Sequence, residues 1–151
     1  NNVFANLTIK ENLSMASYTL NSQLKSDRIP ELFETFPVLK KYEKRKAETL
    51  SGGERQMLAM AMALIRRPKV ILFDEPTANL APKLAAEVLS KIDHVRKEFG
   101  ITVILVEQNV KRALELGDFV YLFANGKLVF KGEPDELLKH PELSKMYLGV
   151  G

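Results

Sequence analysis

Two uninterrupted apolar runs, at residues 70–73 and 103–106, constrain the fold of this chain more than any other feature. Successive side chains of a strand point to opposite faces, so a strand is apolar throughout only when both faces are buried, as in a parallel sheet covered by helices. Residues 83–99 have a helical pattern, and Gly100 is the residue type that ends a helix. The segment therefore predicts a β-α-β unit and an α/β fold class, with a mostly parallel sheet and flanking helices.

The residues before this unit predict helices, whose limits are marked by capping residues and prolines. The expected helices are residues 9–20 capped by Thr8, a segment capped by Asp27 that runs to Phe36 with Pro30 in its first turn, and residues 52–67 ended by Pro68. The change of pattern near residue 68 divides the chain into two parts. These are a helical subdomain, residues 1–68, and an α/β part, residues 69–151.

The residues after 106 predict a hairpin and short helices. Asn125-Gly126, the strongest short signal for a two-residue turn, lies between the apolar segments 119–123 and 128–130. An antiparallel hairpin there makes the sheet mixed at its far edge. Prolines 134 and 141 suit the first turns of two final helices, which are expected to end at residues 138 and 147.

The composition excludes several classes of protein. The 151 residues include no Cys, which excludes disulfides, thiol nucleophiles, iron–sulfur clusters and Cys-ligated zinc, and which agrees with a reducing, cytoplasmic location. The longest apolar run, residues 57–65, is too short to span a membrane. Because the chain begins with Asn1 and has no signal-peptide pattern, we expect it to be part of a longer protein.

Two adjacent carboxylates, Asp74 and Glu75, directly follow the first apolar run, where open α/β sheets bind ligands. They suit a divalent cation that is bound to a nucleotide. Asp74 would hold Mg²⁺, directly or through water, and Glu75 would orient or deprotonate an attacking water. The alternative is that both acids only open a turn before Pro76.

The second candidate site is the sequence Ser51-Gly52-Gly53 at the start of an expected helix. Ser51 is a good N-cap, the two glycines let an anion approach the backbone N–H groups, and the positive end of the helix dipole faces the same point. The alternative is an ordinary capping box made by Ser51 and Glu54. Glycine costs about 1 kcal/mol relative to alanine inside a helix, so capping alone does not explain two of them.

The sequence LSGGERQ at 50–56, followed by VILFDEP at 70–76, closely resembles the signature motif and the Walker B strand of the ATP-binding cassette (ABC) ATPases. The resemblance extends over nearly the whole chain. Residues 4–13 resemble the segment after the family's Q-loop, 31–39 its helical subdomain, 77–82 its D-loop and 106–109 its switch loop. It implies a partial P-loop NTPase domain, with the signature motif in residues 1–68 and the Walker B strand, D-loop and switch loop in residues 69–151.

Three details are similar to the ATPase subunits of branched-chain amino-acid importers. They are Leu-Ala-Pro at the end of the D-loop, Glu-Gln-Asn at 107–109 and Tyr-Leu-Gly at 147–149. The resemblance implies a dimer that binds ATP and Mg²⁺ and drives permease subunits from the inner face of the membrane. Its implied partners are a second ATPase subunit and these permease subunits. The helical lobe, residues 7–42, would contact the permease.

The resemblance also implies a role for each matching residue. Those implied to bind nucleotide held by the partner subunit are Leu50, Ser51, Gly52, Gly53 and Gln56. For nucleotide held by its own subunit, Asp74 is the implied Mg²⁺ ligand, and Glu75 and Gln108 are the implied catalytic residues. The D-loop residues are Asn79, Leu80 and Ala81.

The sequence departs from the family pattern at three places. Gln108 stands where the family has His; it can hydrogen-bond a γ-phosphate or water but cannot titrate, and the alternative is a plain surface residue. Ala81 replaces the usual D-loop Asp. No G-x-x-x-x-G-K-[ST] phosphate loop is present, nor is the Q-loop glutamine. We therefore expect the complete protein to hydrolyse ATP and residues 1–151 alone to be inactive.

A hypothesis from another class is an ABC ATPase that acts on nucleic acid or on the ribosome. The maintenance proteins of that kind insert a long coiled coil before the signature motif, and the proline-punctuated segment 8–46 has none. A ribosomal factor normally carries two cassettes. We therefore expect no direct contact with nucleic acid, and we interpret the basic cluster at 40–46 as a solvated helix face. A third alternative is a folding or interaction module.

Overall fold

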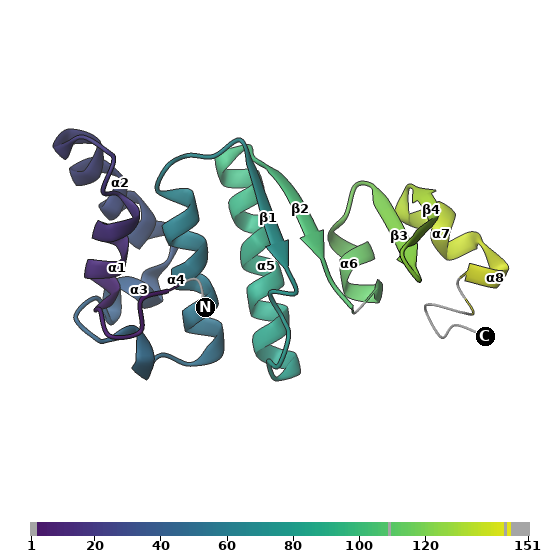
Figure 1. Ribbon diagram of the computed structural model, residues 1–151, viewed down its shortest axis with the longest axis horizontal. Coiled ribbons are helices and arrows are strands. Elements are labelled where there is room, and N and C mark those ends of the chain that lie inside the picture. Colours follow the sequence, from purple (N-terminus) through teal and green to yellow (C-terminus); the bar gives the residue numbers. More distant parts are fainter. Residues whose placement is uncertain (1–2, 109, 144, 146–151) are drawn as a thin grey trace. The chain divides into compact units, whose positions relative to one another are not determined.

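The computed structural model describes residues 3–108, 110–143 and 145 (Figure 1). The chain divides into two compact units, Asn1–Ile104 and Leu105–Gly151, each described here by itself. This boundary separates compact bodies, whereas the sequence division at residue 68 separates kinds of secondary structure. Within the described part of the chain, no helix has both the length and the apolar character needed to cross a membrane.

The first unit contains a group of helices followed by a β-α-β unit. Its helices are α1 (Ile9–Ala16), α2 (Ser22–Thr35), α3 (Pro37–Lys41), α4 (Gly52–Leu64) and α5 (Pro82–Phe99), and its strands are β1 (Val70–Asp74) and the start of β2 (Thr102–Val106). The helices before β1 share an apolar core. Its largest fully buried side chains are Phe36, Ile9, Leu13, Leu32, Leu39, Leu58, Leu64 and Ile65.

The predicted N-cap of α1 is confirmed, but its predicted end is wrong. The hydroxyl of Thr8 accepts a hydrogen bond from the Glu11 N–H (3.2 Å), and the Glu11 carboxylate accepts one from the Thr8 N–H (2.7 Å). This bond to the backbone holds the pKa of Glu11 below its usual value. The helix ends at Ala16, where Ser17 caps it, and not at residue 20.

The predicted start of α2 is also wrong. The helix begins at Ser22, and Asn21 caps it by accepting a hydrogen bond from the Leu24 N–H (2.8 Å). Asn and Asp are about equally good N-caps, so the local pattern did not separate Asn21 from Asp27. Pro30 therefore lies inside the helix, and Pro37 begins α3 as well as ending α2.

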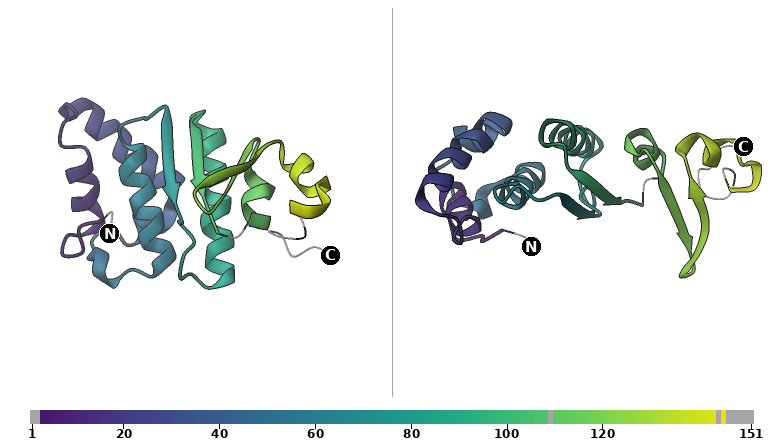
Figure 2. Two further views of the ribbon diagram at one scale, coloured as in Figure 1. Left: turned by 45° about the vertical axis from the view of Figure 1, so that its right-hand side comes forward. Right: turned by 90° about the horizontal axis from the view of Figure 1, so that it is seen from above.

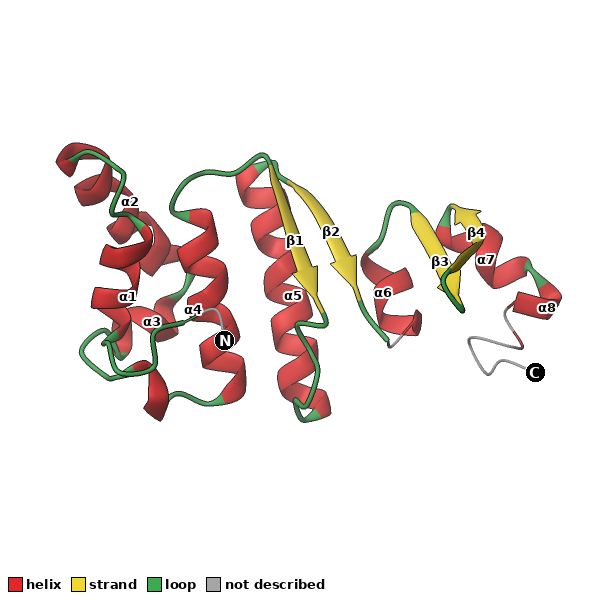
Figure 3. Cartoon of the chain, in the orientation of Figure 1, coloured by secondary structure: helices red, strands yellow, loops and turns green. Residues whose placement is uncertain are grey.

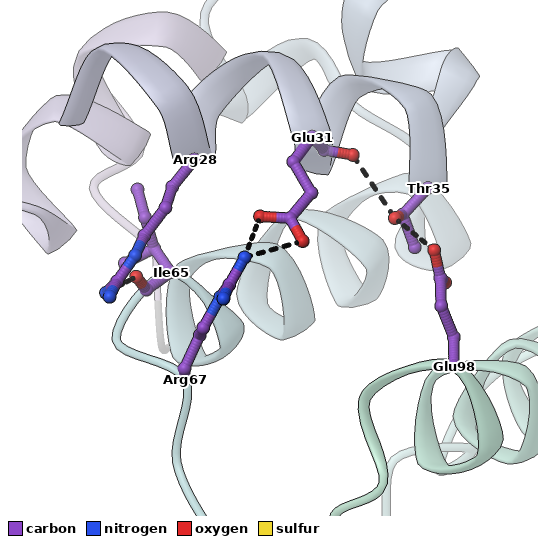
Figure 4. Close-up of polar contacts among 6 residues, drawn as sticks. All are labelled: Arg28, Glu31, Thr35, Ile65, Arg67 and Glu98. Atoms are coloured by element: carbon purple, nitrogen blue, oxygen red, sulfur yellow. Dashed lines mark hydrogen bonds and ion pairs between the residues drawn. The ribbon is translucent and has the colours of Figure 1, made fainter. Parts of the chain in front are cut away.

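Polar contacts tie α2 to the segment after α4 and to α5 (Figure 4). Arg28 donates to the carbonyl of Ile65 (2.8 Å), and Arg67 makes two bonds to the Glu31 carboxylate (2.9 and 3.0 Å). Farther along α2, the Thr35 hydroxyl bonds Glu98 (3.1 Å). Arg67 has a left-handed backbone, with φ 49°, so α4 stops at Leu64 and not at the predicted residue 67.

Asn12 holds the segment before α1 in place. It is fully buried, its Oδ1 accepts from the Phe4 N–H (2.8 Å), and its Nδ2 lies within hydrogen-bond distance of the carbonyls of Phe4, Leu7 and Thr8. One amide side chain thus satisfies the Phe4 N–H, which lies outside regular secondary structure, and bonds the carbonyls of the segment that leads into α1.

Replacing Asn12 by leucine is expected to lower the free energy of unfolding of the complete protein by about 2 kcal/mol, because the change takes the acceptor away from the Phe4 N–H. Urea unfolding measures the loss. Asn6→Leu, at an exposed position in the same segment, is the matched control and should change the value by less than about 0.5 kcal/mol. Equal effects of the two changes would contradict the role of Asn12.

The predicted β-α-β unit is confirmed. β1 and β2 are neighbours in one sheet, their arrows run the same way in Figure 3, and α5 lies against one face in both views of Figure 2. Gly100 ends α5 with φ 60°, as predicted. The expected burial of both sheet faces is not observed. The side chains of Val70 and Leu72 are 52% and 62% exposed, and the sheet that contains them has two strands.

The second unit contains the predicted hairpin. Its elements are α6 (Val110–Leu116), β3 (Val120–Ala124), β4 (Lys127–Gly132), α7 (Pro134–Lys139) and α8 (Pro141–Leu143). The strands are antiparallel, and Asn125 and Gly126 turn between them with φ 48° and 72°. The expected mixed sheet is not observed, because β3 and β4 pair with each other in a sheet separate from that of β1 and β2. Tyr-Leu-Gly at 147–149 lies outside the described residues.

Candidate functional site

The turn before α4 has the geometry of a complete capping box. The Ser51 hydroxyl accepts a hydrogen bond from the Glu54 N–H (3.3 Å), and the Glu54 carboxylate accepts one from the Ser51 N–H (2.8 Å). A hydroxyl has one proton to donate and two lone pairs, so this cap leaves the Ser51 O–H able to donate to a ligand. Because Gly52 and Gly53 open the helix, their N–H groups have no acceptor within it. Capping and anion binding are therefore compatible at this turn.

The two glycines lie under side chains of their own chain. A Cβ at position 52 would lie 2.6 Å from Cδ2 of Leu80, and one at position 53 would lie 3.6 Å from Cδ2 of Leu84. Gly52 is exposed, so the turn is open on its other side, and Gly53 is buried. Sequence reasoning missed this contact. The glycines alone could have signalled a close approach, but nothing in the sequence says which residue approaches.

The other residues predicted for this turn have different environments. Leu50 is only 5% exposed and packs in the core, and its carbonyl accepts a hydrogen bond from the Arg55 guanidinium (3.3 Å). Gln56 lies half-buried on α4. The apolar side chain of Leu50 and the guanidinium of Arg55 therefore support the turn on the side that faces the protein core. Ser51 and Gly52 are exposed to solvent.

The acid pair lies at the carboxyl end of β1. Asp74 is the last residue of the strand and is exposed, and Glu75 is half-buried with a left-handed backbone of φ 46°. A left-handed glutamate is unusual, and such strained backbone collects at functional sites. Hydrogen bonds from the Ala78 N–H to the Glu75 carbonyl (3.1 Å) and from the Leu80 N–H to the Thr77 carbonyl (3.2 Å) fold the next residues into tight turns.

Asp74 suits Mg²⁺ only where a bound nucleotide supplies further oxygen ligands. The described residues contain no cluster of three or more His, Cys, Asp or Glu that could surround a metal ion. Mg²⁺ keeps most of its waters and takes one or two carboxylates together with phosphate oxygens of a substrate. Asp74 is therefore suited to a nucleotide-bound ion and not to a cage made by protein alone.

The remaining predicted residues follow the acid pair. Asn79 is exposed with φ 61°, Leu80 covers Gly52, and Ala81 is the N-cap position of α5. Gln108 belongs to the second unit, where it is exposed and its carbonyl accepts a hydrogen bond from the Val110 N–H (3.0 Å). The structure thus brings the predicted D-loop and signature segments together within one unit.

A cavity of about 620 Å³ lies elsewhere in the first unit, where α4 leads into β1 and α5 leads into β2. The charged side chains in its lining belong to Glu31, Arg67, Lys69 and Glu98. Three of these already take part in the contacts between α2 and its neighbours. Neither the Ser51–Gly53 turn nor the acid pair lines this cavity, so the two candidate motifs do not close into it.

Comparison with known proteins gives one family. The family model described as "ABC transporter" matches residues 1–78. The chain is 50% identical over 149 residues to a probable branched-chain amino acid transport ATP-binding protein, LivF of Archaeoglobus fulgidus, covering 99% of this chain and 63% of that protein. It is 40% identical to the high-affinity branched-chain amino acid transport ATP-binding protein BraG of Pseudomonas aeruginosa, covering 97% and 63%. Thus the chain spans about 63% of the length of these relatives.

More distant relatives and solved structures agree. The thiamine import ATP-binding protein ThiQ of Brucella abortus is 36% identical, covering 99% of this chain and 63% of ThiQ. The structure of cbiO1 from Clostridium perfringens, part of an ABC transporter complex, matches with TM-score 0.83 at 22% identity, covering 97% and 60%. MJ1267, an ATP-binding cassette in its ADP conformation, matches with TM-score 0.80 at 25% identity, covering 97% and 64%. These structures confirm the predicted fold class.

Proposed function

We propose, since the chain belongs to the ABC transporter family, that it is part of an ATP-binding and hydrolysing subunit of an importer. One observation carries the proposal. A serine-capped helix start that opens with two glycines and a pair of carboxylates after a strand belong to the same compact unit, and neither motif lines the cavity described above. In the proposed arrangement each motif serves a separate nucleotide.

Each motif has a distinct role in this proposal. The Ser51 hydroxyl and the N–H groups of Gly52 and Gly53 donate to the γ-phosphate of ATP held by a second subunit. Glu75 takes a proton from the water that attacks the γ-phosphorus of ATP held by its own subunit, and the bond from that phosphorus to ADP breaks. Asp74 would hold the Mg²⁺, whose charge stabilises the phosphate oxygens.

The other residues act as supports. Gln56 and Leu50 shape the signature turn, Asn79 and Ala81 line the segment that faces the partner, and Gln108 hydrogen-bonds the γ-phosphate or the attacking water. The division at residue 68 gives a helical subdomain that carries the signature turn and an α/β part that carries the acid pair. Closure of the pair on ATP and its opening after hydrolysis would power transport.

The implied partners are a second ATPase subunit and membrane permease subunits, with the chain placed in the cytoplasm on the inner face of the membrane. Branched-chain amino acids are the proposed cargo because LivF and BraG are named for that transport. The alternative of nucleic-acid binding has less support, because two cations of the basic cluster at 40–46 contact an aromatic ring of their own chain. In the basic cluster, Lys41 and Arg45 lie over the Tyr42 ring, at 5.1 and 4.7 Å from its centre.

Residues 1–151 alone are expected to show no Mg²⁺-dependent ATP turnover, whereas the complete protein hydrolyses ATP. The reason is that this sequence contains no phosphate loop, whose lysine and glycines supply most contacts to the β- and γ-phosphates. Phosphate release by the two proteins, measured side by side, tests this. Robust turnover by residues 1–151 that Glu75→Gln abolishes would contradict the prediction, and no turnover by the complete protein would contradict the proposed function.

A further inference from the structure

A side chain from the turn that follows the acid pair packs against the signature turn. Leu80 is half-buried, and its Cδ2 lies where a side chain at position 52 would begin. The distance of 2.6 Å between that atom and a Cβ at position 52 is far inside van der Waals contact, so a larger residue at position 52 would require the end of the Leu80 side chain to move. A Cβ at position 53 would lie 3.6 Å from Cδ2 of Leu84, which is an ordinary van der Waals distance.

The backbone of Leu80 has little freedom to move away. Two turn hydrogen bonds, from Ala78 to Glu75 and from Leu80 to Thr77, connect it to the acid pair, and Pro82 begins α5 immediately after it. The left-handed residues Glu75 and Asn79 fix the path of the chain between these points. Because its backbone is held in this way, Leu80 gives Gly52 a fixed surface to pack against.

We propose that Leu80 is a positioning residue, and that its packing on Gly52 fixes where the Ser51–Gly53 turn stands relative to the acid pair of the same chain. Position 52 is then a glycine because of this internal contact, and not only because a phosphate approaches it. The inference rests on the proposed function for the meaning of the turn. The contact itself can be tested without nucleotide.

The test is a double-mutant cycle in the complete protein, followed first by thermal unfolding without nucleotide. Alanine is a better helix former than glycine, so Gly52→Ala should raise the unfolding midpoint in a Leu80→Ala background, where the added methyl group meets no side chain. In the wild-type background the same change should fail to raise the midpoint, because it displaces Leu80. Leu84→Ala is the matched background and should not produce the difference. Equal shifts in the wild-type and Leu80→Ala backgrounds would overturn the proposal.

ATP turnover gives the second readout. Leu80→Ala should lower kcat roughly tenfold and leave the KM for ATP within about twofold, because a misplaced turn weakens contacts to the transferring phosphate and not the binding of ATP by its own subunit. Leu80→Met should keep most of the wild-type kcat, and Leu84→Ala should change kcat by less than about twofold. An unchanged kcat in Leu80→Ala would overturn the positioning role. If the wild-type protein had no turnover, the proposed function would fail while the unfolding cycle still decided the contact.

Discussion

Glu75→Gln in the complete protein is expected to lower ATP turnover by about 10²–10⁴-fold, the usual contribution of a general base. Glutamine has nearly the same shape as glutamate but takes no proton from the attacking water at neutral pH. ATP binding depends on other groups, so ATP should remain bound and the paired subunits should stay closed on it. Steady-state phosphate release and retention of labelled ATP on a size-exclusion column measure the two effects.

This substitution is well controlled because Glu75 has a left-handed backbone, with φ 46°. Glutamine is no easier to hold in that conformation than glutamate, so the strain is the same before and after the change. The unfolding midpoint should therefore stay close to the wild-type value, which separates chemistry from folding. Turnover at the wild-type rate would remove Glu75 from the role of base and leave the simpler interpretation, that the two acids only open a turn.

Local sequence patterns predicted the elements whose limits depend on a single strong residue. Gly100 ends α5, Asn125-Gly126 makes the hairpin turn, and Thr8 caps α1, because each position demands a residue type that few others can replace. The position of the acid pair was predictable for the same reason, because the apolar run at 70–73 defines β1 and the two acids follow it directly. At these points local and tertiary preferences agree.

The sequence did not predict features that depend on contacts between distant segments. α4 stops short of residue 67, where Arg67 has a left-handed backbone and its guanidinium bonds Glu31 on α2. The start of α2 was missed for a local reason, because Asn21 and Asp27 are equally good caps. The apolar runs predicted strands buried on both faces, yet burial depends on what packs against them. Neither the helical pattern nor the apolar runs show which distant residues pack against them.

The role of Leu80 belongs to this second group. Two adjacent glycines at a helix start are well explained by an anion, and that explanation is sufficient without the structure. Only the coordinates show a leucine from the turn after the acid pair above the first glycine. Glycine at position 52 thus meets two physical requirements, the approach of an anion and the packing of Leu80. The sequence pattern does not distinguish between them.

Ser51→Asp is expected to preserve the stability of the complete protein and to abolish most of its ATP turnover. Aspartate is as good an N-cap as serine and is favoured by the helix dipole, so the bond from the Glu54 N–H should survive and the free energy of unfolding should change by less than about 1 kcal/mol. A carboxylate beside a γ-phosphate loses the donor and adds repulsion of about 4 kcal/mol at 4 Å near a protein surface, which corresponds to a loss on the order of 10²–10³-fold.

Ser51→Ala is the matched comparison, because it has the opposite balance of effects. It removes the cap, which should cost about 1 kcal/mol in urea unfolding, but it adds no charge, so its turnover should fall less than that of Ser51→Asp. If Ser51→Asp kept wild-type turnover, Ser51 would be a cap and nothing more.

Where two copies of the chain pair, mixing Ser51→Asp with Glu75→Gln subunits should restore activity, because one nucleotide site then has both Ser51 and Glu75 intact. This rescue requires that the two residues of one chain serve different nucleotides, so its absence between two such copies would contradict the paired arrangement.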